Sequence, residues 1–110
     1  MLDIELPVLD EKATKKNVLA ALYKYRIYLK SDKGNKERKN YIKKMNEALY
    51  RLESECDRII IRKYMFKSKV NRFELIRELN LSEGDYYRKR NQAFYNYAYE
   101  LGIDIMKNER

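Results

Sequence analysis

The sequence predicts an all-α fold, a small helical bundle with a C-terminal helix-turn-helix. Glycine and proline together occupy only four of the 110 positions, while 45% of the residues are hydrophobic and 38% are charged. This composition favours helices over strands and turns. Apolar residues also recur at steps of three and four, the periodicity of one helix face. We expect an N-terminal helical arm or hairpin over residues 1–54 and a helix-turn-helix DNA-binding domain over residues 55–110, or else one compact unit.

The first helix is expected from about Ala13, after an extended lead-in over residues 1–11 that carries the only proline, Pro7. Its apolar positions form a stripe along a single face, at Val18, Leu22, Tyr25 and Leu29. The stretch SDKGNKERKN, residues 31–40, then interrupts the periodicity and contains Gly34, which predicts a loop. Residues 33–44 hold six cations against one acid. This basic segment either contacts DNA phosphates or is solvated surface.

The longest apolar rhythm comes next, at Ile42, Met45, Leu49, Leu52, Cys56 and Ile59. Alternating steps of three and four are typical of a helix that packs lengthwise against another helix. Two interpretations stay open, because this stripe could join the core of its own chain or form the face of a homodimer. Ser54 followed by Asp57 resembles a helix N-cap with its acidic partner three residues on. Residues 40–66 therefore form either one helix or two.

Three further helices are expected in the C-terminal half. The first covers residues 57–66. Asn71 with Glu74 marks the start of the second, over residues 72–79, whose apolar set is Phe73, Leu75, Ile76 and Leu79. Asn80 stands where a helix needs a left-handed C-cap, a conformation that Asn tolerates better than most non-glycine residues. Ser82 is a strong N-cap for the last helix, which we expect to reach Leu101 with Gly102 as its stop.

A helix, a three-residue turn and a basic helix form the layout of helix-turn-helix DNA binding. The sheltered face of the last helix is expected to comprise Tyr86, Ala93, Phe94, Tyr97, Leu101 and the aliphatic stem of Arg90. The outward face is rich in side chains that pair with base edges, and the candidate base-contacting residues are Gly84, Asp85, Tyr87, Arg88, Asn91 and Gln92. The candidate phosphate contacts are Arg62, Lys63, Lys67, Lys69, Arg72, Ser82 and Lys89.

The net charge of +8 and the pI near 9.5 indicate an anionic partner, nucleic acid first and a membrane surface second. Residues 1–55 contain 13 basic and 9 acidic residues, and residues 56–110 contain 12 and 8, so each half carries about +4. The alternative is a solvated basic protein with no special partner. No apolar run reaches the roughly 18 residues that a membrane span needs. We therefore expect a cytoplasmic protein that does not contact the membrane.

The chemistry of enzymes is poorly represented in the chain. It has no histidine, which excludes the usual zinc sites and imidazole bases. Its single cysteine, Cys56, lies in an apolar rhythm and is expected to be a buried, reduced thiol. Neither a phosphate-binding glycine loop nor a recognisable acid pair is present. We expect a protein that is not an enzyme and that needs neither a cofactor nor a metal.

Two stretches, RIIIRKYM and FELIRELNLSEGDYYRKRNQAFYNYAYELG, resemble the ArpU/RinA-type phage transcriptional regulators. Their C-terminal half is similar to the sigma-factor region that contacts the −35 promoter element. The resemblance covers roughly residues 15–102, with Asn80 in place of the commoner glycine at the corner and Gly84-Asp85 as a more acidic helix start. It implies an activator of phage or mobile-element late genes that binds a promoter in double-stranded DNA and acts with RNA polymerase in the cytoplasm of a bacterial host cell.

Two alternative functions belong to other classes. A phage packaging or structural protein, similar to the small DNA-recognition subunit of a terminase, also combines a helix-turn-helix with helical oligomerisation. A ring of eight or more subunits would favour packaging, whereas a monomer or dimer would favour the regulator. The second alternative is an adaptor on RNA polymerase whose 11 tyrosines form an interaction surface.

Overall fold

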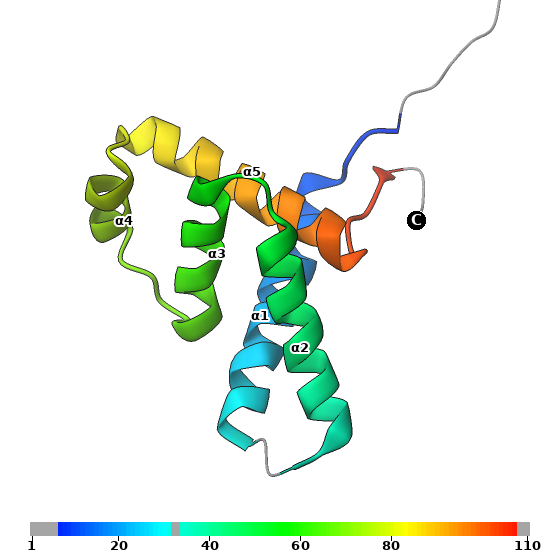
Figure 1. Cartoon of the computed structure of the whole chain (residues 1–110). Helices are drawn as coiled ribbons and strands as arrows, with labels where there is room; N and C mark the ends of the chain where they lie inside the picture. Colours follow the sequence, from blue (N-terminus) through cyan, green and yellow to red (C-terminus); the bar gives the residue numbers. More distant parts are fainter. Residues whose placement is uncertain (1–6, 32–33, 108–110) are drawn as a thin grey trace, which may run out of the picture.

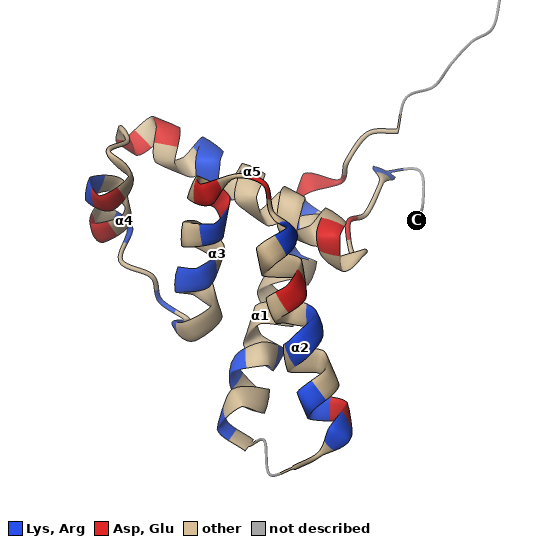
Figure 2. Cartoon of the chain, in the orientation of Figure 1, with Lys and Arg blue, Asp and Glu red and all other residues tan. Residues whose placement is uncertain are grey.

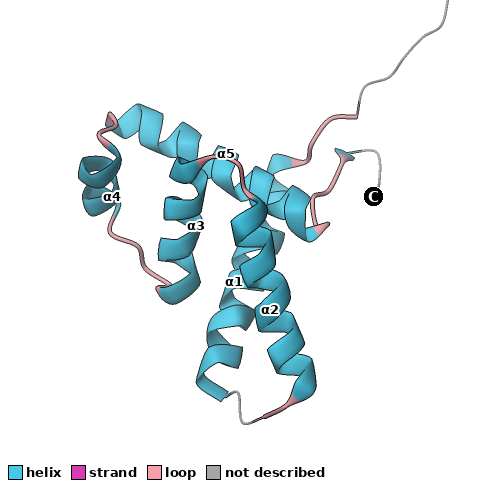
Figure 3. Ribbon diagram, in the orientation of Figure 1, coloured by secondary structure: helices cyan, strands magenta, loops and turns pink. Residues whose placement is uncertain are grey.

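The residues that the structure describes fold into five helices, confirming the all-α class (Figures 1 and 3). The computed structural model describes residues 7–31 and 34–107. The helices are α1 (Glu11–Ser31), α2 (Lys36–Arg51), α3 (Glu55–Phe66), α4 (Arg72–Leu79) and α5 (Glu83–Leu101). The one β-bridge in the described ranges pairs Leu9 with Met106. None of the helices in these ranges is long and apolar enough to cross a membrane.

The ends of the described chain are tied together beside the first turns of α1. The Asp10 N–H donates to the Ile105 carbonyl at 2.7 Å, and the Asn17 amide donates to the Ile103 carbonyl at 3.1 Å. The Asp10 side chain also accepts the Ala13 N–H, so α1 begins at Glu11, two residues before the expected start. Residues 1–6 of the expected lead-in lie outside the described residues.

Helix boundaries follow the capping residues. The Ser54 side chain accepts the Asp57 N–H, and the Asn71 side chain accepts the N–H groups of Phe73 and Glu74. Both predicted N-caps are therefore confirmed. Residues 40–66 form two helices, because Leu52 leaves the helical conformation at ψ 128° and α3 restarts after Ser54. The stretch over residues 31–40 contains the expected loop, which includes Gly34 and Asn35. Asn35 caps α2, so most of the basic segment over residues 33–44 is helical.

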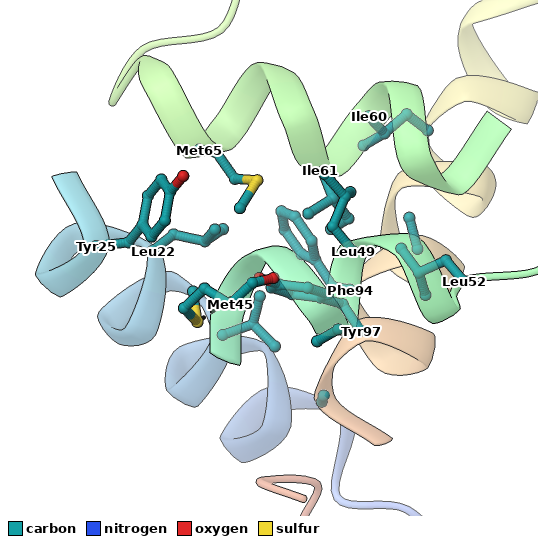
Figure 4. Close-up of a cluster of buried hydrophobic side chains, with 14 residues drawn as sticks. Leu22, Tyr25, Met45, Leu49, Leu52, Ile60, Ile61, Met65, Phe94 and Tyr97 are labelled. Atoms are coloured by element: carbon teal, nitrogen blue, oxygen red, sulfur yellow. Dashed lines mark hydrogen bonds between the residues drawn. The ribbon is translucent and has the colours of Figure 1, made fainter. Parts of the chain in front are cut away.

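A single hydrophobic core joins α1, α2, α3 and α5 (Figure 4). Leu22 and Tyr25 from α1 meet Met45 and Leu49 from α2. The other buried members are Val18, Ala48, Leu52, Ile60, Ile61, Met65, Ala93, Phe94, Tyr97 and Ala98. The core therefore draws on residues from both sides of the domain boundary expected at residue 54. Leu75 of α4 is buried outside this cluster.

Several predicted core positions are wrong or only partly buried. Leu29 is exposed, because the last turns of α1 extend beyond the end of α3 (Figure 1). Phe73 is also exposed, since it cannot share a helix face with the buried Leu75 two residues on. Cys56 lies at the solvent-accessible start of α3 and is only half-buried rather than buried.

The apolar stripe from Ile42 to Ile59 does not remain on one continuous helix face. Its central members Met45, Leu49 and Leu52 are buried in the core of their own chain. Ile42 and Ile59 are only partly buried, on two different helices. A homodimer through this stripe stays a prediction, and only Ile42, Cys56 and Ile59 are partly accessible to it.

Candidate nucleic-acid interface

The corner between α4 and α5 is built as the sequence predicts. Asn80 adopts the left-handed conformation, with φ 54° and ψ 51°. The N–H groups of Asn80 and Leu81 return to the Arg77 and Ile76 carbonyls, which satisfies the open end of α4. The Ser82 hydroxyl then accepts the Asp85 N–H at 3.1 Å. Three residues thus separate two capped helices.

One face of α5 is fixed against the rest of the molecule. Tyr86, Phe94 and Tyr97 are each no more than 1% exposed. Tyr97 donates its hydroxyl to the Met45 carbonyl at 2.9 Å, and the Phe94 ring meets the Tyr64 ring edge-on. The expected sheltered face is confirmed for its buried members Tyr86, Ala93, Phe94 and Tyr97.

Arg90 sits at the edge of this sheltered face, as expected. Its guanidinium lies 5.1 Å from the Tyr87 ring centroid and 5.9 Å from that of Phe94. The same group donates to the Asn91 side-chain oxygen. Arg90 therefore covers two aromatic rings with its side chain and orients one candidate base-contacting residue.

The opposite face of α5 carries the six candidate base contacts. Gly84, Arg88 and Gln92 are exposed, whereas Asp85, Tyr87 and Asn91 are partly buried. A Cβ atom at Gly84 would meet nothing within 4 Å, so the first turn of α5 is open to a close approach from outside. The structure brings these six residues onto the outer side of one helix. Their contact with bases stays a prediction.

The two acids in the first turn of α5 each form an ion pair with an arginine; Figure 2 shows the red segments at the start of α5 and a blue segment further along it. Asp85 pairs with Arg88 one turn on, and Glu83 lies 3.5 Å from the Arg72 guanidinium. Arg72 also donates to the Tyr87 hydroxyl at 2.6 Å. The Ser82 hydroxyl and the Arg88 guanidinium lower the pKa of the Asp85 carboxyl below its usual value. In the free protein this edge is therefore nearly neutral and its arginines are already oriented.

The candidate phosphate contacts do not form one group. Arg72 borders the first turns of α5 through Glu83 and Tyr87. Lys63 pairs with Glu78 at 3.6 Å, beside Arg62. Lys67 borders the same hollow as Arg62 and Lys63. Together with Lys69 it also lines a second hollow beside α1.

Two other candidates for phosphate contact belong to α5. Ser82 already uses its hydroxyl to cap this helix. Lys89 is exposed in its second turn, and the Lys89 charge opposes the rise in the pKa of the Cys56 thiol. Burial nevertheless raises the pKa of the Cys56 thiol, which favours an unreactive side chain.

The positive charge gathers in residues 24–44 more strongly than an even division of the chain indicates. This segment holds nine Lys or Arg against two Asp or Glu, a net charge of +7 in a chain of +8. It comprises the end of α1 and the first half of α2, where Lys24 lies 4.7 Å from the Tyr41 ring centroid and Arg38 lies 5.4 Å from that of Tyr28. Counting the charges in a window of about 20 residues, rather than in each half of the chain, identifies this basic segment from the sequence.

No three acidic or cysteine side chains in residues 7–31 and 34–107 gather closely enough to hold a metal ion. The arrangement offers oriented donors and cations at the start of α5 and a separate basic end on α1 and α2. Side chains of these kinds can bind anionic or hydrogen-bonding groups.

Neither a protein-family model, nor a curated protein, nor a solved structure matches this chain. The resemblance to the ArpU/RinA-type regulators therefore stays a prediction from its motifs. The geometry and charge of the described residues are the basis for a functional proposal.

Proposed function

We propose that this chain is a sequence-specific double-stranded DNA-binding protein that regulates transcription, with α4 and α5 as its helix-turn-helix. The observation that carries the proposal is the capped three-residue corner, after which the start of α5 presents an open polar face. In a helix-turn-helix, the first turns of the second helix contact base edges in the major groove. The sheltered face of α5 is anchored in the core, so the helix would present these side chains from a rigid support.

Each side chain of the open face has a chemical role in this proposal. Arg88 forms paired hydrogen bonds with guanine, and Asn91 or Gln92 does so with adenine. Arg72 and Lys89 contact phosphates on either side and set the register. Gln92 donates to Asn96, which in turn donates to the buried Asp57. This chain of hydrogen bonds ties the outer face of α5 to α3.

The acids Glu83 and Asp85 shape the specificity of this surface. They repel phosphate unless a base amine or a cation meets them, so they disfavour non-specific binding along the backbone. Their partners Arg72 and Arg88 are solvent-exposed ion pairs, and such pairs exchange at little cost. When DNA binds, its phosphate and base acceptors can therefore take the place of the two acids as partners of Arg72 and Arg88. Activation of late genes together with RNA polymerase is proposed from the family resemblance alone.

Equilibrium binding to labelled duplexes tests the proposal through matched arginine variants. Arg88→Ala should lower the preference for a selected site over a scrambled duplex by roughly 5- to 150-fold, the effect of one bidentate base contact. Arg51→Ala is the control, because Arg51 is also an acid-paired arginine but binds Glu100 at the other end of α5. An unchanged preference in Arg88→Ala would contradict the assignment of α5.

Two other functions remain open to test. The mass of the protein in solution separates the packaging alternative, since a ring of eight or more subunits would favour a terminase-like role. The adaptor alternative is favoured by exposed aromatic side chains away from α5's outer face, among them Tyr23, Tyr50 and Phe66. Failure to bind duplex DNA at low salt, combined with binding to a protein, would support the adaptor.

A further inference from the structure

A groove of about 680 Å³ lies between α1 and the start of the α3–α4 loop. It is at the C-terminal end of α3, away from the corner between α4 and α5 (Figure 1). Its volume is typical of sites that hold a small ligand or the anchor of a peptide. The lining combines large apolar side chains with cations and contains no acid.

The apolar part of the groove is unusually open to solvent. Tyr23 is 61% exposed and Ile27 42%, and they are neighbours one turn apart on α1. Phe66, at the end of α3, is 60% exposed across from them. Single exposed apolar residues are common on protein surfaces, but these three share one hollow with Leu29, which is 40% exposed. Such a cluster indicates an interaction site.

The cations of the groove are available to a ligand. Lys30 lies at the end of α1, and Lys67 and Lys69 lie on the loop after α3. None of the three pairs with a carboxylate in the described ranges of the chain. They therefore form a positive rim around the apolar side chains. Figure 2 shows the blue segments at the end of α3, on the following loop and on α1.

Two contacts fix the walls of the groove relative to each other. The Arg26 guanidinium donates to the Tyr64 carbonyl near the end of α3 at 2.6 Å. The Tyr25 and Phe66 rings meet edge-to-face, with centroids 6.3 Å apart. Because these contacts join α1 to α3 directly, the groove is preformed and a ligand would not have to order it.

We propose that this groove binds an acidic segment of a partner protein. The segment places an apolar side chain among Tyr23, Ile27 and Phe66, and its carboxylates lie against Lys30, Lys67 and Lys69. DNA is the less suitable ligand, because a phosphate backbone offers nothing to three exposed apolar side chains. The inference assigns Lys67 and Lys69 to a protein partner rather than to phosphate, and it does not depend on the DNA-binding proposal.

Selection from a random peptide display library against the whole chain tests this inference. Enriched peptides should combine two or more acids with an aromatic or aliphatic residue, and a labelled synthetic copy should bind more weakly as salt increases. Phe66→Ser and Lys67→Glu should each weaken binding of this peptide by about tenfold, as loss of an anchor does in other interfaces. Both side chains are exposed, so circular dichroism should show an unchanged fold.

Matched controls lie elsewhere on the surface. Phe73→Ser removes an aromatic ring that is 57% exposed on α4, and Lys43→Glu reverses an exposed charge on α2. Both should leave the affinity for the peptide within twofold. Phe66→Ser should also leave the affinity for duplex DNA unchanged, which separates this inference from the proposed function.

Three results would overturn the inference. The first is a selection that enriches no peptide, or only peptides without acids. The second is peptide binding that persists in Phe66→Ser and Lys67→Glu. The third is evidence for another occupant of the groove. Loss of duplex DNA binding in Lys67→Glu and Lys69→Glu would assign the groove to phosphate. A change in the mass of the assembly in solution in Phe66→Ser would assign the groove to a second copy of the chain.

Discussion

Replacing Asn80 with valine probes the corner on which the DNA-binding proposal depends. Asn80 lies at φ 54° and ψ 51°, where a side chain with a Cβ approaches the following carbonyl oxygen. The left-handed conformation costs an ordinary L-residue about 1–2 kcal/mol, and Asn is among the few that visit it routinely. Valine should therefore destabilise the protein by about 1–2 kcal/mol. Glycine, which has no Cβ, should be tolerated at the same position.

Thermal unfolding followed by circular dichroism measures this difference. For a chain of this length, 1 kcal/mol corresponds to about 4 °C in Tm, so Asn80→Val should unfold about 4–8 °C below the parent. Gly84→Ala is the control in the same segment. Gly84 is helical and has open space around its Cβ position, so alanine should raise stability by up to about 1 kcal/mol. If the Asn80→Val variant were as stable as the parent protein, residue 80 would not adopt the left-handed backbone conformation.

The remaining predictions concern the core, the pH dependence and the phosphate contacts. Tyr97→Phe removes the buried hydrogen bond to the Met45 carbonyl and should lower the free energy of unfolding by about 1 kcal/mol in urea; no loss would contradict that bond. Burial, and next the neighbouring Tyr28, raise the pKa of Tyr41 to about 12. The pKa of an unfolded tyrosine is about 10. The stability that comes from keeping Tyr41 protonated in the fold is therefore fully present below about pH 10 and is lost as the pH rises towards 12. Tyr41→Phe should flatten the fall in unfolding free energy over that window, and an equally steep fall would exclude Tyr41 as a cause. Arg72→Ala should weaken binding to all duplexes alike and reduce the salt slope by about 1 in filter-binding assays, whereas a change in site preference would make Arg72 a base contact.

The features that the sequence predicts well are local ones. Ser54, Asn71 and Ser82 cap helices because a short polar side chain reaches the N–H two or three residues on. Asn80 and Gly102 end helices in the left-handed conformation, which depends mainly on the residue itself. These signals need no knowledge of the tertiary structure.

The features that the sequence does not predict depend on distant contacts. Periodicity places Leu29 on an apolar stripe, but only the packed helices show that its end of α1 extends past α3. The groove between Tyr23 and Phe66 joins residues more than 40 positions apart. Lys67 and Arg72 are close in sequence, yet one lines that groove and the other borders α5. A charge pattern alone could not separate them.

Selection of bound sites from a pool of random duplex DNA tests the central claim most directly, because it examines binding and specificity together. The proposal predicts that a shared sequence motif is enriched, and that Arg88→Ala, carried through the same selection, relaxes the preference at one or two positions of that motif. Enrichment of no motif, or of the same motif with undiminished preference in Arg88→Ala, would contradict the assignment of α5 as the helix that recognises DNA.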